Sequence, residues 1–380
     1  MGFRQFTTSE FTSLRTQHNI MALVGNGFDI QVTRKHRTRF SPRYTAFYHY
    51  LQARDSDSTN AIVRQMGWLR DAGRTDWSDL EGAIASLVSP PGGSLVTEVV
   101  YEATVAIQEA FSEYLELVAP PDLLATLGKE SSSRSLAIRS MSDFIGDVAR
   151  SPSFEKFRFP AATSHYDLFN FLFVNFNYTP LLDDYVYRDS GQWQPRRFTR
   201  ADRNFEFHPN PTGHRGGHGN EATGWSSYLR TEVVHPHGQQ AIPRSLLFGI
   251  DAPDGFDPGT HPHRKLMKPY WAMTDIEYGH LFADVELFII FGCSLGVTDG
   301  WWWRRILGGL GGAPADDKPA SEVVIYWWSP AEAPDSNADI VEKFFVGAGV
   351  APDDPIRQRV QDQIHVVVYT DLDPPVWLAT

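Results

Sequence analysis

The chain is poor in cysteine, in long apolar runs and in positive charge. Its 380 residues include one cysteine, Cys293, so it can form neither an internal disulfide nor a four-cysteine zinc site. No apolar signal segment opens the sequence, and the longest apolar run, from Val285 to Leu295, is far shorter than the ~20 residues that span a bilayer. The net charge of -12 argues against generic nucleic-acid binding. We expect a cytoplasmic protein without membrane attachment.

Short apolar runs bounded by glycine or polar residues predict an α/β fold. Hydrophobic residues make up 42% of the chain, enough for a sizeable core. Runs without polar alternation are typical of parallel strands that are covered on both faces. The expected strands are 20–24, 171–176, 246–250, 286–291, 323–328 and 364–369. Most of the segments between them can hold a crossover helix, so we predict a Rossmann-like open parallel sheet.

Two segments stand apart from this sheet. The pattern is helical through residues 60–160, which predicts a large helical insertion in a main domain formed by 1–59 and 161–380. Residues 188–232 are crowded with Arg, Asn, Gly, His and Pro and contain few aliphatic residues. We expect a long flexible loop there, mobile or acting as a lid.

The most informative stretch follows the first expected strand and reads Gly25-Asn26-Gly27-Phe28-Asp29. A strand that runs into glycines is how open α/β sheets bring backbone N–H groups against a phosphate. Ile30 leaves the dinucleotide fingerprint G-x-G-x-x-G incomplete, but residues 1–50 carry seven basic and two acidic side chains. A tight turn followed by a solvated basic helix is the alternative. Asp29 could orient a ribose or nicotinamide group, or cap the helix.

Polar residues also follow other expected strands. Asn177, Tyr178 and Thr179 come after 171–176, at a strand end where ligands of such folds collect, although an Asx turn is the alternative. His237 follows a strand-like run and precedes a glycine. A histidine in that place suits proton transfer near neutral pH, and a purely structural histidine is the alternative.

The run 287–291 ends in Gly292-Cys293-Ser294, with Asp299 beyond. Ser294 could donate to a phosphate from a helix N-terminus, whereas Cys293, inside an apolar run, is expected to be an inert buried thiol.

We expect no metal site. Four histidines lie between residues 208 and 235, but their spacing does not suit a pair of metal ligands on one helix, and no cysteine or regular acidic ligands accompany them. These histidines are His208, His214, His218 and His235.

Five motifs, in this order and spacing, resemble those of the bacterial abortive-infection AbiH family of phage-defence proteins. They are GNGFD (25–29), WSDLE (77–81), FNYT (176–179), HPHG (235–238) and FGCSLGVTD (291–299). That family is in turn distantly similar to sirtuin-like NAD-binding proteins. The resemblance implies catalytic roles for Asn177, at the ribose, and His237, as general base. The binding residues that we expect are Gly25, Asn26, Gly27, Phe28, Asp29, Tyr178, Thr179, Gly292, Ser294 and Asp299.

The resemblance implies an enzyme that binds NAD and hydrolyses its nicotinamide–ribose bond during infection. Thr179 stands where the sirtuin pattern has an Asp, and one cysteine cannot build the zinc module of protein-deacylating sirtuins. A non-catalytic nucleotide sensor that acts with a partner defence protein, or as a homo-oligomer, is the alternative. A nuclease ranks last, because it needs clustered carboxylates for a divalent metal.

Overall fold

A six-stranded parallel sheet organises the protein. The computed structural model describes residues 3–54, 59–88, 97–187, 205–209, 224–252, 261–311 and 320–380. The strands of this sheet are β1 (Gln17–Val24), β2 (Leu168–Asn175), β5 (Tyr228–Val234), β6 (Leu287–Phe291), β7 (Glu322–Trp328) and β8 (Ile364–Tyr369). Their spatial order is β5-β2-β1-β6-β7-β8. Numbered along the chain, this is the order 3-2-1-4-5-6 of doubly wound dinucleotide-binding sheets, so the predicted Rossmann-like fold is confirmed.

The central strands are buried on both faces, which is why their sequences lack polar alternation. All eight residues of β2 and all five of β6 are buried. The register places Val24 opposite both Asn175 and Phe291, so β1, β2 and β6 end at the same level. Five of the six predicted strands are confirmed.

The remaining prediction, a strand at 246–250, is wrong. That segment makes one isolated bridge, between Ile250 and Met267, and its Leu246 and Phe248 are buried among helices. An apolar run buried against helices cannot be told from a strand by its sequence pattern.

A strand occupies part of the segment predicted to be a loop. Residues 228–232 belong to β5, so the loop prediction is wrong there, and the short strands β3 (Glu206–Phe207) and β4 (Trp225–Ser226) pair antiparallel. The edge strand β5 is half-exposed, and polar residues in its first part hid that part in the sequence, whereas its end is the strand-like run that precedes His237. Residues 188–204 and 210–223 of the predicted loop lie outside the described residues.

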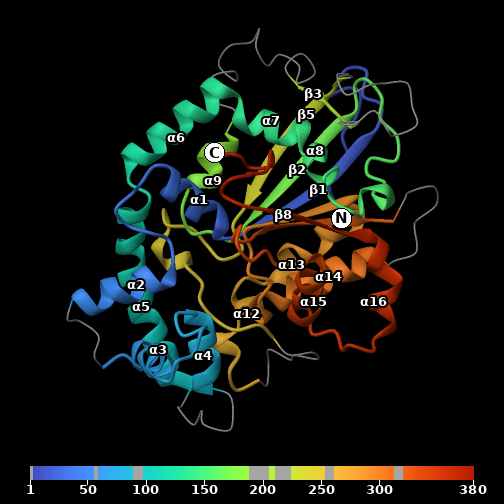
Figure 1. Cartoon of the computed structure of the whole chain (residues 1–380). Helices are drawn as coiled ribbons and strands as arrows, with labels where there is room; N and C mark the ends of the chain where they lie inside the picture. Colours follow the sequence, from blue (N-terminus) through green and yellow to red (C-terminus); the bar gives the residue numbers. More distant parts are fainter. Residues whose placement is uncertain are drawn as a thin grey trace.

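Helices cover both faces of the sheet, and a further group lies apart (Figure 1). The helices are α1 (Gly27–Lys35), α2 (Tyr44–Ala53), α3 (Ala61–Asp71), α4 (Leu80–Val88), α5 (Thr97–Val118), α6 (Pro121–Arg134), α7 (Leu136–Asp143), α8 (Ile145–Val148), α9 (Leu181–Val186), α12 (Lys268–Trp271), α13 (Thr274–Glu277), α14 (Gly300–Gly311), α15 (Asn337–Gly347) and α16 (Pro355–Val360). Side chains of α1 and α6–α9 share a core with one face of the sheet, and those of α14–α16 share one with the other face.

Helices α2–α5 form a third core of their own, which we call the helical lobe. The region 60–160, predicted as one helical insertion, thus contributes α3–α5 to the lobe and α6–α8 to the layer on the sheet. Tyr178, Phe248 and Leu266 pack into the lobe from segments that follow sheet strands. The lobe is therefore anchored beside the carboxyl edge of the sheet.

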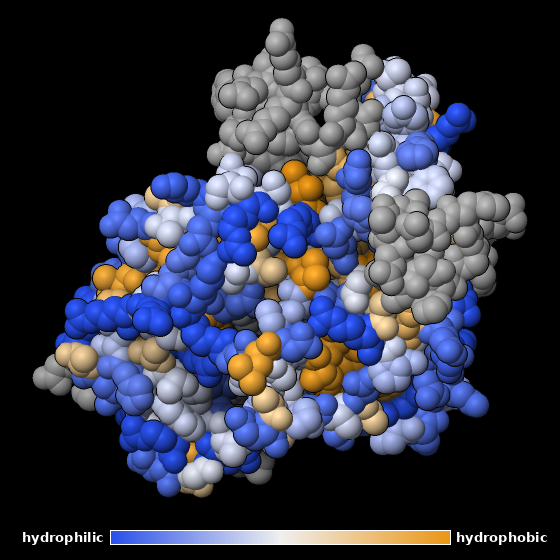
Figure 2. Space-filling view, turned by 45° about the horizontal axis from the view of Figure 1, so that its top comes forward, coloured by the Kyte–Doolittle hydropathy of each residue, from blue (hydrophilic) through white to orange (hydrophobic). Residues whose placement is uncertain are grey.

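Within the described ranges, no helix is both long enough and apolar enough to cross a membrane. On the face of the molecule shown in Figure 2, hydrophilic and hydrophobic residues are interspersed.

Candidate functional site

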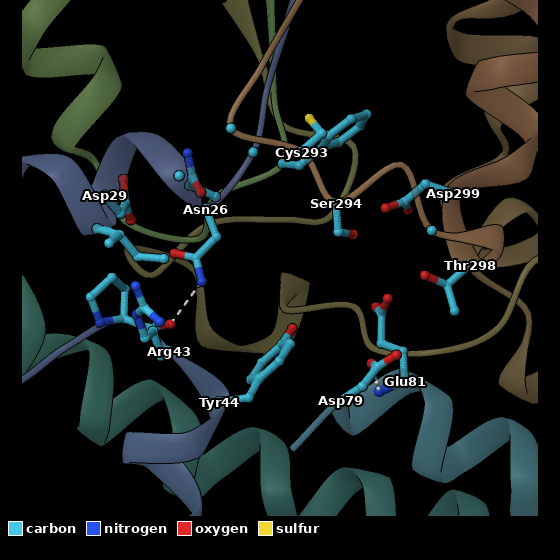
Figure 3. A pocket seen from close by; sticks show the side chains of 18 of the residues that line it. Asn26, Asp29, Arg43, Tyr44, Asp79, Glu81, Cys293, Ser294, Thr298 and Asp299 are labelled. Atoms are coloured by element: carbon cyan, nitrogen blue, oxygen red, sulfur yellow. Dashed lines mark hydrogen bonds between the residues drawn. The ribbon is translucent and has the colours of Figure 1, made fainter. Parts of the chain in front are cut away.

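A cavity of about 800 Å³ opens between the carboxyl edge of the sheet and the helical lobe. In Figure 3, Cys293, Ser294 and Asp299 lie on one side of it, and Tyr44 and Glu81 lie on the opposite side. Eleven of the twelve predicted site residues line this cavity. They are Gly25, Asn26, Gly27, Asp29, Asn177, Tyr178, Thr179, His237, Gly292, Ser294 and Asp299.

The glycine loops after β1 and β6 are packed directly against each other. Gly27 N–H donates to the Gly292 carbonyl at 2.9 Å, and Gly25 N–H donates to the Phe291 carbonyl at 2.8 Å. A Cβ on Gly27 would lie 2.4 Å from the Gly292 Cα, and Gly292 itself has a φ of +67°. The glycines are thus needed to join two loops, and these two amides are already engaged. The strand order reverses between β1 and β6, which is where ligands of such sheets bind.

The side chains of Asn26 and Phe28, which follow Gly25, point in different directions. The Asn26 amide donates to the Pro42 carbonyl at 2.9 Å and so ties the loop to the chain entering the lobe. Phe28 is fully buried and meets the ring of Tyr185 edge-on, and it does not line the cavity. The Phe28 ring therefore does not lie where a ligand contact was predicted, because it packs into the apolar core beneath α1.

Asp29 is buried and only half satisfied. Its Oδ2 accepts a hydrogen bond of 2.6 Å from the Thr179 hydroxyl, while Oδ1 has no partner among the described residues. Burial raises the pKa of Asp29 to about 7; the bond from Thr179 opposes this rise and the charge of Asp183 adds to it. Asp29 therefore changes charge near neutral pH, at the wall of the cavity.

Asn177 presents an amide that no described residue satisfies. Its backbone N–H donates to Asn175 Oδ1 at 3.0 Å, but its side-chain Oδ1 and Nδ2 are both buried without a partner in the described part of the chain. Asn175 in turn donates to Asp183, which lies 2.9 Å from His235 Nε2. Buried polar atoms without partners are costly, so the Asn177 side chain is a candidate ligand contact.

His237 and Asp299, from the ends of β5 and β6, meet at the cavity wall. The imidazole stacks on Phe176 with ring centroids 4.9 Å apart, and its Nε2 lies 3.4 Å from Asp299 Oδ1. The same oxygen lies 2.5 Å from Lys268 Nζ, which also contacts Glu81 Oε2 at 2.9 Å. One buried ammonium thus joins the sheet end to the helical lobe.

The charges of this cluster stabilise one another. Burial acts to lower the pKa of Lys268, but Asp299 and Glu81 outweigh it and hold the pKa above its ordinary value. Burial likewise acts to raise the pKa of Asp299, and the charge of Lys268 and the hydrogen bond from His237 bring it below its ordinary value. The pKa of Glu81 stays raised, because its burial exceeds the effect of Lys268. Asp299 is therefore the ionised partner of Lys268 near neutral pH.

A family model described as bacteriophage abortive infection AbiH matches residues 21–315, more than half of the chain. The chain belongs to the AbiH family. No curated protein matches the sequence. The matched region contains every predicted site residue and both newly found cluster residues, Glu81 and Lys268.

Sequence reasoning missed two members of the charged cluster of this AbiH protein, Glu81 and Lys268. Glu81 stands out in the sequence only as part of WSDLE. That motif explains its position, because Asp79 Oδ1 accepts from the backbone N–H of Glu81 and Gly82 at the start of α4. Lys268 gave no signal, since its partners lie 187 and 31 residues away in the chain.

Two further predictions concern the Cys293 thiol and metal ligands. Burial raises the pKa of the Cys293 thiol well above its usual range, so it stays protonated. The described residues contain no group of three or more His, Cys, Asp or Glu side chains suited to a metal ion. His208 and His235 lie near Asp143 and Asp183 respectively, and His214 and His218 fall outside the described residues.

Proposed function

We propose that this AbiH-family protein serves abortive-infection defence by binding NAD in the cavity and hydrolysing the nicotinamide–ribose bond. One observation carries the proposal: motifs spread from Gly25 to Asp299 line a single cavity where the strand order reverses. Its volume of about 800 Å³ falls in the range of small-molecule and cofactor sites.

The charges at the cavity wall suit this substrate. The lining includes the carboxyl groups of Asp29, Asp76, Asp79, Glu81 and Asp299, of which Glu81 and Asp299 are paired with Lys268 and Asp76 with Arg74. Breaking the nicotinamide–ribose bond passes through an oxocarbenium-like state, whose positive charge nearby carboxylates stabilise. The exposed Arg43 also lines the cavity and makes no ion pair with the described residues, which leaves it for a pyrophosphate.

Asn177 and His237 supply the remaining roles. The unpartnered Asn177 amide can hold a ribose hydroxyl or the attacking water. An imidazole that donates Nε2–H to Asp299 keeps the lone pair on Nδ1, which takes a proton from the water as its oxygen bonds to the ribose C1′. The bond from C1′ to nicotinamide breaks, and its electron pair leaves with nicotinamide.

The test is release of free nicotinamide from NAD by the purified protein. We expect Asn177→Ala and His237→Ala each to lower the rate by about 100-fold or more, since a positioned base contributes roughly 10²–10⁴. The exposed histidine variant His280→Ala serves as the control and should retain activity. Equal turnover in both site variants and the control would remove the assignment of these residues.

A module that binds nucleotide without cleaving it is the second candidate. It is favoured by the Thr179 hydroxyl, which is committed to Asp29, and by Lys268, which neutralises Asp299. Calorimetric binding of NAD without any nicotinamide after long incubation would support this candidate and exclude hydrolysis.

A further inference from the structure

The cavity extends along the carboxyl edge of the sheet well beyond the glycine loops after β1 and β6. Its lining runs from His237, after β5, through Asn177 and Ser294 to Trp328 at the end of β7. Four strand spacings separate β5 from β7 in the sheet. At ~4.8 Å each, they span roughly 19 Å, enough for two ring systems joined by a linker.

Trp328 ends this edge with an open aromatic face. The residue is 42% exposed, and its Nε1–H donates to Asp371 Oδ1 at 2.7 Å. Asp371 is held in turn by the guanidinium of Arg34, whose Nη1 lies 2.7 Å from Oδ2. The indole edge is therefore fixed, while no aromatic ring or cation of the described residues covers its face.

The neighbouring aromatic residues are already occupied. Trp327 donates to Asp335, and the ammonium of Lys343 lies over its ring, 4.6 Å from the centroid. At the other end of the cavity, His237 is stacked on Phe176. Among these rings at the cavity wall, Trp328 is the one that offers a fixed, uncovered surface to a ligand.

We propose that Trp328 is the stacking platform for the purine base of the bound nucleotide. This rests on the proposed function and gives the ligand a direction along the sheet edge. The nicotinamide riboside end lies at Asn177 and His237, and the purine lies at the end of β7. Trp328 lies outside the region 21–315 that matches the family model, so the family motifs do not supply this contact.

The test compares half-ligands by isothermal titration calorimetry. Adenosine monophosphate carries the purine, and nicotinamide mononucleotide does not. We expect Trp328→Ala to weaken adenosine monophosphate binding about tenfold, in line with base stacking on aromatic side chains, and to leave nicotinamide mononucleotide unchanged. Trp328→Tyr, which keeps a flat ring, should restore most of the affinity. Trp68→Ala removes an indole that is 64% exposed on α3 and should change neither ligand.

Three results overturn the subsite: no binding of adenosine monophosphate to the unmodified protein, unchanged binding to Trp328→Ala, or equal losses for both half-ligands. The outcome is separable from the hydrolase proposal. Purine binding that depends on Trp328 without nicotinamide release retains the subsite and rejects hydrolysis. Nicotinamide release with an unchanged KM for NAD in Trp328→Ala retains hydrolysis and rejects the subsite.

Discussion

Replacing Lys268 by methionine should destabilise the protein, because it removes the cation that neutralises buried carboxyl groups between the sheet and the helical lobe. Lys268 is 3% exposed and Glu81 is 8% exposed, and the ammonium lies within 2.9 Å of both Glu81 and Asp299. Lys268→Met keeps most of the volume but leaves two buried carboxyl groups without their cation. Removing one partner of a buried ion pair costs about 3–5 kcal/mol, so we expect a loss of that order in the free energy of unfolding.

The assay is urea denaturation at pH 7, with unfolding followed by circular dichroism. Lys265→Met is the matched control, because Lys265 pairs with Glu98 at 2.9 Å and both side chains are largely exposed. We expect the control to lose less than about 1 kcal/mol. Similar small losses in Lys265→Met and Lys268→Met would refute the reasoning, since the cluster would then contribute no more than a surface pair.

The loss should depend on pH in a defined direction. Burial raises the pKa of Glu81 in the folded protein. Without Lys268, the ionised carboxylate is left uncompensated, so the folded state of the variant takes up a proton as the pH falls through this raised pKa. The deficit of Lys268→Met should therefore shrink toward acidic pH. The double variant Glu81→Gln, Lys268→Met should recover part of the deficit at pH 7, as a double-mutant cycle would reveal.

Three further predictions concern other parts of the fold. Burial acts to lower the pKa of His18, but Asp167 and Glu286 outweigh it and raise the pKa to about 9. His18 therefore contributes up to ~3 kcal/mol of stability below pH 6.5, which is lost as the pH rises through 9. In His18→Gln, the free energy of unfolding should depend less on pH over that window. Gly27→Ala should lower the free energy of unfolding by about 1–3 kcal/mol through overpacking. Gly308→Ala is the control and should cost nothing, because no atom outside the backbone of its own helix lies within 4 Å of the added carbon. Equal thermal midpoints of the two variants would contradict this. Trp377→Ala empties a fully buried site and should cost about 3–5 kcal/mol in chemical denaturation, and a loss under 1 kcal/mol would show that the site collapses.

The sheet was predictable where the sequence leaves few choices. Strands β1, β2, β6 and β7 have helices on both faces, and their apolar runs of four to six residues follow from that burial. The first part of the edge strand β5 was not recognised because Arg230, Thr231 and Glu232 interrupt its apolar pattern. The segment 246–250 was wrongly predicted as a strand for the opposite reason. Its apolar residues Leu246 and Phe248 pack in the core of the helical lobe and not in the sheet.

The site was predictable where the backbone itself is constrained. Gly25, Gly27 and Gly292 indicate a close approach of the backbone, which the structure shows to be between the loops after β1 and β6. Asn177 and His237 follow strands that end at one edge. The direction of a side chain is not given by such patterns, so Phe28 was placed at the ligand although it points into the core. Lys268 depends on pairing between distant segments, which one sequence does not reveal.

The placement of β1 has a consequence for the rate of folding. This central strand pairs with β2 and β6, and Ile20 faces both Phe171 and Leu287 across those ladders. Closing such long loops must precede any reward from pairing, so proteins rich in distant contacts fold slowly. The glycine loops after β1 and β6 are brought together by the ladder between these two strands, which pairs Val24 with Phe291. The cavity walled by these loops should therefore form late in refolding, after most of the helical signal has returned; binding of the proposed nucleotide ligand, followed during refolding, would check this order.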